Sequence, residues 1–356
     1  MKAALWYSAN DIRVEEVPEP DVAPGMVKIK VKWCGICGSD IHEYLTGPIA
    51  IPVEAPHPIT GKIAPIIIGH ELSGEVTEIG KGVTKFKAGD RVVLEPIVIC
   101  GTCPACLEGK YNLCENVGFH GLCGTGGGFA EYTVFPERFV HKIPDHISYE
   151  KAALVEPFAV ALHSLDVGGF AAGQTAAVIG AGPIGLATIE TLKAAGARTV
   201  IAVQRKSIRQ EYAKKVGADI VLDPDEVDAA AEIKSLTNGR VDMAFEVTGT
   251  RGGFDVGLAS LRFSGTYVIT SIWEDTVPVM LNDLVYSEIK IVGTISSRRN
   301  FPGAIALMSD DRVKAEGYVT KKIYLDDILE QGFHALIGPE KKKQIKIIVT
   351  PDRSIL

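Results

Sequence analysis

A glycine-rich turn between a short apolar run and a helical stretch constrains the fold of this 356-residue chain more than any other feature. The run Ala177-Val178-Ile179 is followed by Gly180-Ala181-Gly182-Pro183-Ile184-Gly185. Gly180 permits a tight turn, Gly182 lets the backbone approach a pyrophosphate, and Gly185 allows a helix to pack closely on a strand. Pro183 and Ile184 then open a helix whose N-terminus favours a bound anion. This strand–turn–helix context predicts a dinucleotide-binding unit.

The segments around this turn predict a parallel sheet. From residue 156 onwards, short β-branched runs alternate with helical stretches, which indicates an α/β unit with a doubly wound sheet, the Rossmann arrangement. We expect strands at 176–179, 199–203, 220–222, 241–246, 266–270 and 289–295, with helices at 183–195, 207–216 and 229–236. After residue 296 we expect a helix, a strand at 318–324, another helix and a closing strand at 344–350.

The first 155 residues have a different pattern of predicted elements. Short alternating segments at 27–32, 72–79, 90–94 and 130–134 are separated by glycine and proline, which predicts a β-rich barrel or sandwich. A proline-rich loop at 47–65 leaves two alternatives open, a surface loop or a lid over a substrate pocket. We therefore divide the chain into 1–155, 156–296 and 297–356, and we expect the last segment to return to the first domain.

The end of the second strand of the parallel sheet bears on cofactor choice. An NAD-binding unit places Asp or Glu here to bind the ribose 2′-hydroxyl, whereas this chain has Gln204 followed by Arg205 and, later, Arg209. Gln204 does not repel a 2′-phosphate, and the two arginines can grip one through charge-assisted hydrogen bonds. A solvated basic helix start is the alternative. The sequence favours NADP(H) over NAD(H).

Four cysteines form the strongest metal signal. Cys100, Cys103, Cys106 and Cys114 lie within a lobe at about 96–116, with the tight spacing of a closed tetrahedral zinc site. Four cysteines can also hold iron and sulfur. The gap of seven before Cys114 and the nearby nucleotide motif favour a structural zinc.

A second group of possible metal ligands is spread over three segments. Cys37 is followed closely by Ser39, Asp40 and His42, and His70-Glu71 and Glu156 come later in the chain. A thiolate, an imidazole and carboxylates of this kind can converge on one zinc that keeps an open position for a substrate.

Composition excludes several classes of partner. The net charge is −7 and no long basic run occurs, so nucleic acid and anionic membranes are not expected partners. No apolar run reaches the roughly 18 residues of a membrane span, and no signal-peptide core precedes Ser8. We expect a cytoplasmic protein.

Taken in this order, the motifs resemble those of the zinc-dependent medium-chain alcohol and polyol dehydrogenases over essentially the whole chain. The resemblance rests on Gly35-Ile36-Cys37-Gly38-Ser39-Asp40, Gly69-His70-Glu71, the four cysteines, Gly128-Phe129-Ala130-Glu131-Tyr132 and the glycine-rich turn. Glu156-Pro157, where other members have cysteine, is similar to the sorbitol and 2,3-butanediol dehydrogenase branch. The resemblance implies a GroES-like catalytic domain built from both chain ends and a Rossmann domain between them.

The resemblance also implies roles for single residues. Cys37, His70 and Glu156 match ligands of a catalytic zinc, and Glu71 matches a residue that is a direct ligand in some members. Asp40 matches the carboxylate that orients the ligand histidine, and Ser39 with His42 matches a proton path. Two zinc ions per chain are therefore expected, one catalytic and one structural.

The implied reaction is hydride transfer between NADP(H) and a vicinal diol or hydroxyketone, most similar to 2,3-butanediol and acetoin. A sorbitol or ketose reductase and an L-threonine dehydrogenase remain alternative enzymes. A nucleotide-binding structural relative is the non-enzymatic alternative. The family also implies a homodimer or homotetramer.

Overall fold

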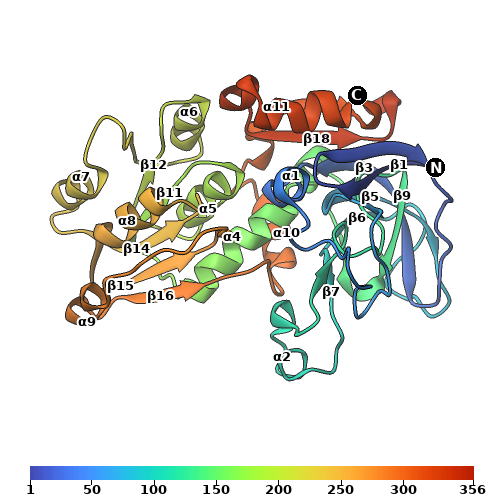
Figure 1. The fold of residues 1–356 in the computed structure, drawn as a ribbon, viewed down its shortest axis with the longest axis horizontal. Coiled ribbons are helices and arrows are strands. Elements are labelled where there is room, and N and C mark those ends of the chain that lie inside the picture. The colour runs from blue at the N-terminus through green and yellow to red at the C-terminus, as the bar shows by residue number, and fades with distance from the viewer. The chain divides into compact units, whose positions relative to one another are not determined.

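The computed structural model describes residues 1–356 and divides them into two compact units. The first unit contains Met1–Glu156 and Ala315–Leu356, and the second contains Pro157–Lys314. Both termini therefore belong to the first unit, as the blue and red ends of the ribbon show (Figure 1).

The first unit is rich in β-structure, as predicted. Its seven-stranded sheet has the order β10-β6-β5-β3-β18-β17, with β9 also paired to β3. These strands are β10 (Val140–Lys142), β6 (Arg91–Leu94), β5 (Glu71–Ile79), β3 (Met26–Gly35), β18 (Lys346–Thr350), β17 (Val319–Tyr324) and β9 (Tyr132–Pro136). The remaining strands form two small sheets, β2 (Asp11–Glu16) with β1 (Lys2–Ser8) and β4 (Ile66–Ile67), and β7 (Ile97–Val98) with β8 (Gly118–Phe119).

Strand β3 is at the centre of the core of this unit. Val27, Ile29 and Val31 alternate along the strand and are fully buried, as its period of two predicts. Short helices flank the sheets: α1 (Gly38–Thr46), α2 (Pro104–Leu107), α3 (Tyr149–Ala152) and α11 (His334–Ile337).

The C-terminal segment joins this sheet through β18. It pairs antiparallel with β3, where Val349 faces Cys34, and parallel with β17. The chain enters the unit at Ala315, later than the expected position 297. The intervening helix α10 (Phe301–Ser309) belongs to the second unit, where its side chains meet those of the first helix of that unit, α4 (Val155–Gly168), around a cavity.

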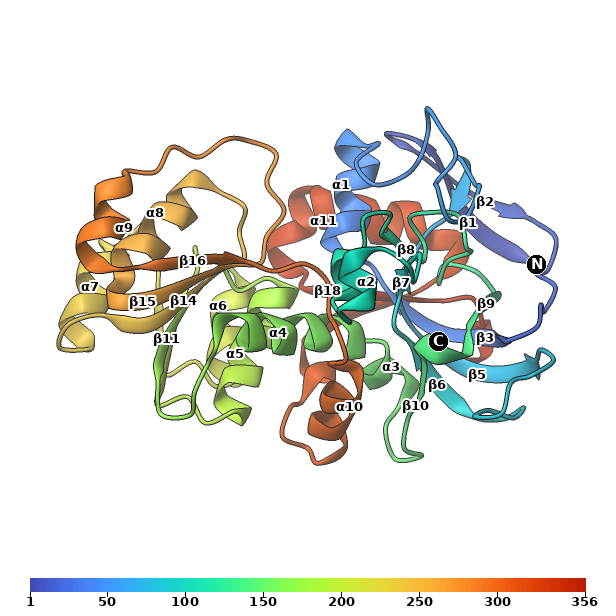
Figure 2. The ribbon, with the colours of Figure 1, turned by 90° about the horizontal axis from the view of Figure 1, so that it is seen from below.

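The second unit contains a six-stranded sheet in the order β13-β12-β11-β14-β15-β16, and all of its strand pairs are parallel. The strands are β11 (Thr175–Ile179), β12 (Thr199–Val203), β13 (Ile220–Leu222), β14 (Val241–Glu246), β15 (Leu261–Ile269) and β16 (Lys290–Gly293). The helices besides α4 and α10 are α5 (Pro183–Ala194), α6 (Ile208–Lys215), α7 (Ala229–Leu236), α8 (Arg251–Ser260) and α9 (Leu281–Ser287). Figure 2 shows the strands of this sheet in the ribbon turned by 90° from the view of Figure 1.

Helices α4, α8 and α9 were not predicted, and strand β15 begins earlier than expected. Helix α8 contains Gly252, Gly253 and Gly257, and such residues weaken a helical pattern. Strand β15 begins at Leu261, five residues before the expected position 266, and its pairing with β14 contains a register shift. The predicted strands at 220–222 and 241–246 have the expected bounds.

The order of strands reverses between β11 and β14, so a crevice for a ligand is expected at their carboxyl ends.

None of the helices combines the length and apolar character needed to cross a membrane.

Candidate functional site

The four-cysteine lobe brings its sulfur atoms together. The ligand atoms of Cys100, Cys103, Cys106 and Cys114 all lie within 4.8 Å of one another. The Sγ atom of Cys100 is 4.0 Å from that of Cys106 and 3.5 Å from that of Cys114. Zinc–sulfur bonds of about 2.3 Å in a tetrahedron put sulfur atoms about 3.8 Å apart, so the set fits zinc.

The electrostatics of the lobe also favour a cation. The N–H groups of Thr102 and Cys103 lie 3.5 and 3.3 Å from the sulfur of Cys100, and such contacts lower its pKa to about 6. Burial and the neighbouring thiols raise the pKa of Cys106 to about 12. Four thiolates therefore coexist here only when a cation neutralises them.

Helix α1 and its N-cap residue contain several residues of the second group of predicted site residues. Cys37 is its N-cap residue, and the N–H of Cys37 donates to Oδ2 of Asp40 at 2.8 Å. The other oxygen of Asp40 is 3.4 Å from Nδ1 of His70, and the hydroxyl of Ser39 is 3.2 Å from Nε2 of His70. The start of the helix thus holds the imidazole from both sides.

The surroundings of His70 suit a ligand imidazole. Burial opposes its protonation, but Asp40 and Cys37 outweigh burial and raise the pKa of His70 well above its ordinary value. A carboxylate near Nδ1 orients the ring, while Nε2 contacts the hydroxyl of Ser39. His42 follows Ser39 by three residues on α1, so the two occupy neighbouring positions on one helix face.

Glu71 forms a buried ion pair that sequence reasoning missed. The ammonium of Lys346 lies 2.7 and 2.6 Å from the two oxygens of Glu71, and both side chains are about 1% exposed. The ammonium also donates to the carbonyl of Ile36 at 3.0 Å. A Cβ at Gly35 would lie 2.1 Å from the Glu71 carboxylate, so only glycine fits there. A role for Glu71 as a zinc ligand stays a prediction, and it would have to compete with Lys346.

Glu156 forms no ion pair, although the charges of His70 and Lys346 partly offset the rise of its pKa. It is the second residue of α4, and its carboxyl is buried. Burial and the neighbouring Glu71 raise the pKa of Glu156 to about 7. A buried carboxyl of this kind gains stability from a nearby dication. Binding of a catalytic zinc by Cys37, His70 and Glu156 stays a prediction.

The glycine-rich turn has the geometry that its residues predict. Gly180 has φ of +103°, and a Cβ there would lie 2.7 Å from Cγ2 of Thr248. A Cβ at Gly185 would lie 2.1 Å from the carbonyl oxygen of Gly180, so helix and turn are in close contact. Gly182 is the N-cap residue of α5, and Pro183 and Ile184 are its first two residues.

The residues after β12 that were predicted to bind the cofactor differ in how close they lie to the glycine-rich turn. Oε1 of Gln204 accepts a hydrogen bond of 2.8 Å from the N–H of Ala181, so Gln204 contacts the glycine-rich turn. Nη1 of Arg209 would lie 3.8 Å from a Cβ at Gly182, and no acidic side chain pairs with this arginine. Burial lowers the pKa of Arg209. Arg205 is exposed, with Nε 3.5 Å from Asp225. The two arginines are therefore not equivalent: Arg209 lies beside the glycine-rich turn, and Arg205 is exposed beside Asp225.

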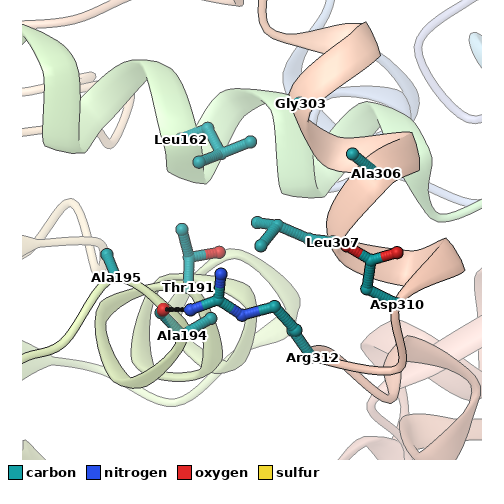
Figure 3. Close-up of a pocket in the computed structure, with 9 residues that line it drawn as sticks. All are labelled: Leu162, Thr191, Ala194, Ala195, Gly303, Ala306, Leu307, Asp310 and Arg312. Carbon is teal, nitrogen blue, oxygen red and sulfur yellow. Dashed lines mark hydrogen bonds between the residues drawn. The ribbon is translucent and has the colours of Figure 1, made fainter.

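A separate cavity of about 480 Å³ lies among α4, α5 and α10 (Figure 3). Leu162, Thr191 and Leu307 are among its lining residues, and Arg312 donates there to the carbonyl of Ala194. Ala194 ends α5, whereas the glycine-rich turn begins it. This cavity is thus remote from the predicted dinucleotide position.

Comparison with known proteins connects these features. Residues 23–145 match the alcohol dehydrogenase GroES-like domain, and residues 183–310 match the zinc-binding dehydrogenase family. The chain is 50% identical over 353 residues to (R,R)-butanediol dehydrogenase of Bacillus subtilis (strain 168), covering 99% of this chain and 100% of that protein.

Solved structures agree with this match. The crystal structure of 2R,3R-butanediol dehydrogenase from Bacillus subtilis has a TM-score of 0.93 and 50% identity, covering 99% of both chains. A zinc-binding dehydrogenase from Sinorhizobium meliloti 1021, bound to NADP, has a TM-score of 0.90 and 30% identity, covering 98% of this chain and 99% of that one. The chain therefore belongs to the zinc-binding alcohol dehydrogenase family, with a GroES-like domain and a Rossmann-type domain.

Proposed function

We propose that this chain interconverts 2,3-butanediol and acetoin by hydride transfer with NADP(H), using a catalytic zinc. The observation that carries the proposal is the imidazole of His70 held between Asp40 and Ser39 beside Cys37. Full-length identity of 50% to an (R,R)-butanediol dehydrogenase supports the choice of substrate.

In this mechanism, zinc held by Cys37, His70 and Glu156 would act as a Lewis acid on the substrate oxygen, and the nicotinamide would carry the hydride. Ser39 takes the proton of the substrate hydroxyl and His42 passes it outwards. Asp40 keeps the ring of His70 in one tautomer and orientation. The ammonium of Lys346 neutralises the carboxylate of Glu71, the residue that follows His70.

The basic residues after β12 support NADP(H). Gln204 replaces the acidic residue that binds a ribose 2′-hydroxyl, and Arg209 provides a cation without an acidic partner near Gly182. A relative that was solved with NADP supports the same choice.

A second copy of the chain is the proposed partner. Strand β16 is an edge of the parallel sheet, and an edge presents unpaired backbone groups that can pair with another strand. Beside it, the apolar residues Met280, Leu281, Val285 and Tyr286 are between 66% and 82% exposed. Apolar side chains exposed next to an open edge favour a homodimer through β16 and α9.

Substrate choice is tested by following NADPH oxidation with acetoin, fructose and a simple ketone, and repeating each assay with NADH. We expect the highest kcat/KM for acetoin with NADPH, because vicinal oxygens suit chelation by zinc. A higher kcat/KM for fructose would contradict the substrate assignment and favour a ketose reductase.

A further inference from the structure

The carboxylate of Glu246 is fully buried at the carboxyl end of β14 and has not entered the mechanism. Its Oε1 accepts from the N–H of Thr248 at 2.8 Å and from the Thr248 hydroxyl. Its Oε2 accepts from the N–H of Gly249 at 3.2 Å and from the hydroxyl of Ser271. Each oxygen thus takes one N–H and one O–H donor.

These donors come from two different segments. Thr248 and Gly249 follow β14, whereas Ser271 follows β15, the next strand in the sheet. The carbonyl of Glu246 also accepts from the N–H of Thr270 at 3.0 Å. Glu246 therefore ties together the two segments that leave neighbouring strands at the same edge.

The same edge carries the glycine-rich turn. Ile179, which precedes Gly180, is level with Glu246 in the sheet, and Glu246 is level with Ile269 of β15. A Cβ at Gly180 would lie 2.7 Å from Cγ2 of Thr248. The segment that Glu246 holds is thus in contact with the turn expected to receive a pyrophosphate.

The strand order decides which half of the dinucleotide meets these segments. The ribose of the adenosine half is recognised at the end of β12, on one side of β11. The pyrophosphate lies at the turn after β11, so the other half extends over β14 and β15 on the opposite side. We propose that Glu246 is a positioning residue for the nicotinamide half: it holds the segments after β14 and β15 in the conformation that receives it. The inference rests on the proposed use of a nicotinamide dinucleotide.

The variant Glu246→Gln tests this role because it keeps the length of the side chain. It replaces one oxygen with an amide donor that must face a backbone N–H. We expect the Kd for NADP⁺, measured by titration of the full chain, to rise about tenfold or more. The affinity for adenosine 2′,5′-bisphosphate, which lacks the nicotinamide half, should not change.

A matched control lies at the other end of the same strand. Asp242 accepts from the N–H and hydroxyl of Thr175 at 2.7 and 2.8 Å and pairs with Arg262, about 13 Å along β14 from Glu246. Asp242→Asn also removes a carboxylate from β14, but it should leave the affinities for NADP⁺ and the bisphosphate unchanged. Ser271→Ala removes one link between the segments, and it tests the role if Glu246→Gln does not fold. We expect it to weaken NADP⁺ binding selectively.

Three results would overturn the assignment. Unchanged NADP⁺ affinity in Glu246→Gln, or in Ser271→Ala where the glutamine variant does not fold, would exclude a positioning role. Equal loss of affinity for NADP⁺ and the bisphosphate would leave a purely structural role. A wild-type chain that binds neither NADP⁺ nor NAD⁺ would overturn the proposed function, and this assignment with it.

Discussion

Glu71 and Glu156 are two buried carboxyl groups in opposite electrostatic surroundings. Lys346 contacts both oxygens of Glu71, whereas burial and the charge of Glu71 raise the pKa of Glu156 to about 7. Glu71 is in direct contact with its counterion, whereas His70 and Lys346 act on Glu156 without forming an ion pair with it. Among these two carboxyl groups, Glu156 is therefore the better candidate for a metal ligand.

The two arginines after β12 allow a prediction about cofactor choice. Arg209→Ala should raise the Kd for NADP⁺ about ten- to hundredfold, because a charged group at the phosphate contributes about 1.5–3 kcal/mol. The Kd for NAD⁺ should rise much less, since NAD⁺ lacks the 2′-phosphate. Titration of both dinucleotides against wild type and variant measures the ratio of the Kd for NADP⁺ to the Kd for NAD⁺ in each protein.

Arg205→Ala serves as the comparison. Arg205 is exposed and lies beside Asp225, so its removal should have a smaller effect than that of Arg209. Equal discrimination of the 2′-phosphate in wild type and Arg209→Ala would show that Arg209 does not bind this group.

At the scale of elements, helix α1 concentrates the chemistry of the first unit. Its N-cap residue is Cys37, its first turn carries Ser39 and Asp40, and His42 follows. The spacing of these residues is local, so their closeness could be predicted from the sequence. The contact of Glu71 with Lys346 could not, because 275 positions separate them and neither segment has a motif that specifies the pair.

The open sheet edge at β16, with the exposed apolar residues of α9 beside it, gives a prediction at this scale. Leu281→Glu combined with Tyr286→Glu should convert a dimer into a monomer, because charge replaces exposed apolar surface next to the strand edge. Size-exclusion chromatography with light scattering measures the mass. Leu107→Glu, at an exposed apolar position in the four-cysteine lobe, should leave the dimer intact. A monomeric wild-type chain would contradict the proposed interface.

For the whole molecule, the alternation of strands and helices was enough to predict a β-rich part and a parallel sheet. The position at which the chain returns to the first unit and the helix α8 were not predicted, because both depend on packing. Helix α10 belongs to the second unit, so the chain returns to the first unit at Ala315 rather than at 297. Helix α8 has three glycines, which weakened its sequence pattern, but its N-cap residue is Thr250, whose hydroxyl accepts from the N–H of Gly253.

The four cysteines and the glycine-rich turn were predictable for another reason. Both are short motifs whose spacing corresponds directly to geometry, and the structure gives each the expected arrangement. Glu246, by contrast, ends an ordinary strand in the sequence, and its four donors become visible only in the folded chain.

The measurement that tests the central claim most directly is acetoin-dependent NADPH oxidation by Cys37→Ala, with NADPH binding measured on the same sample. The account predicts that turnover falls to the background rate while NADPH binding is retained, because Cys37 is proposed as a zinc ligand and belongs to the first unit. Cys34→Ala, which removes a buried free thiol three residues earlier, should keep its turnover. Full activity in Cys37→Ala would contradict the proposed zinc mechanism.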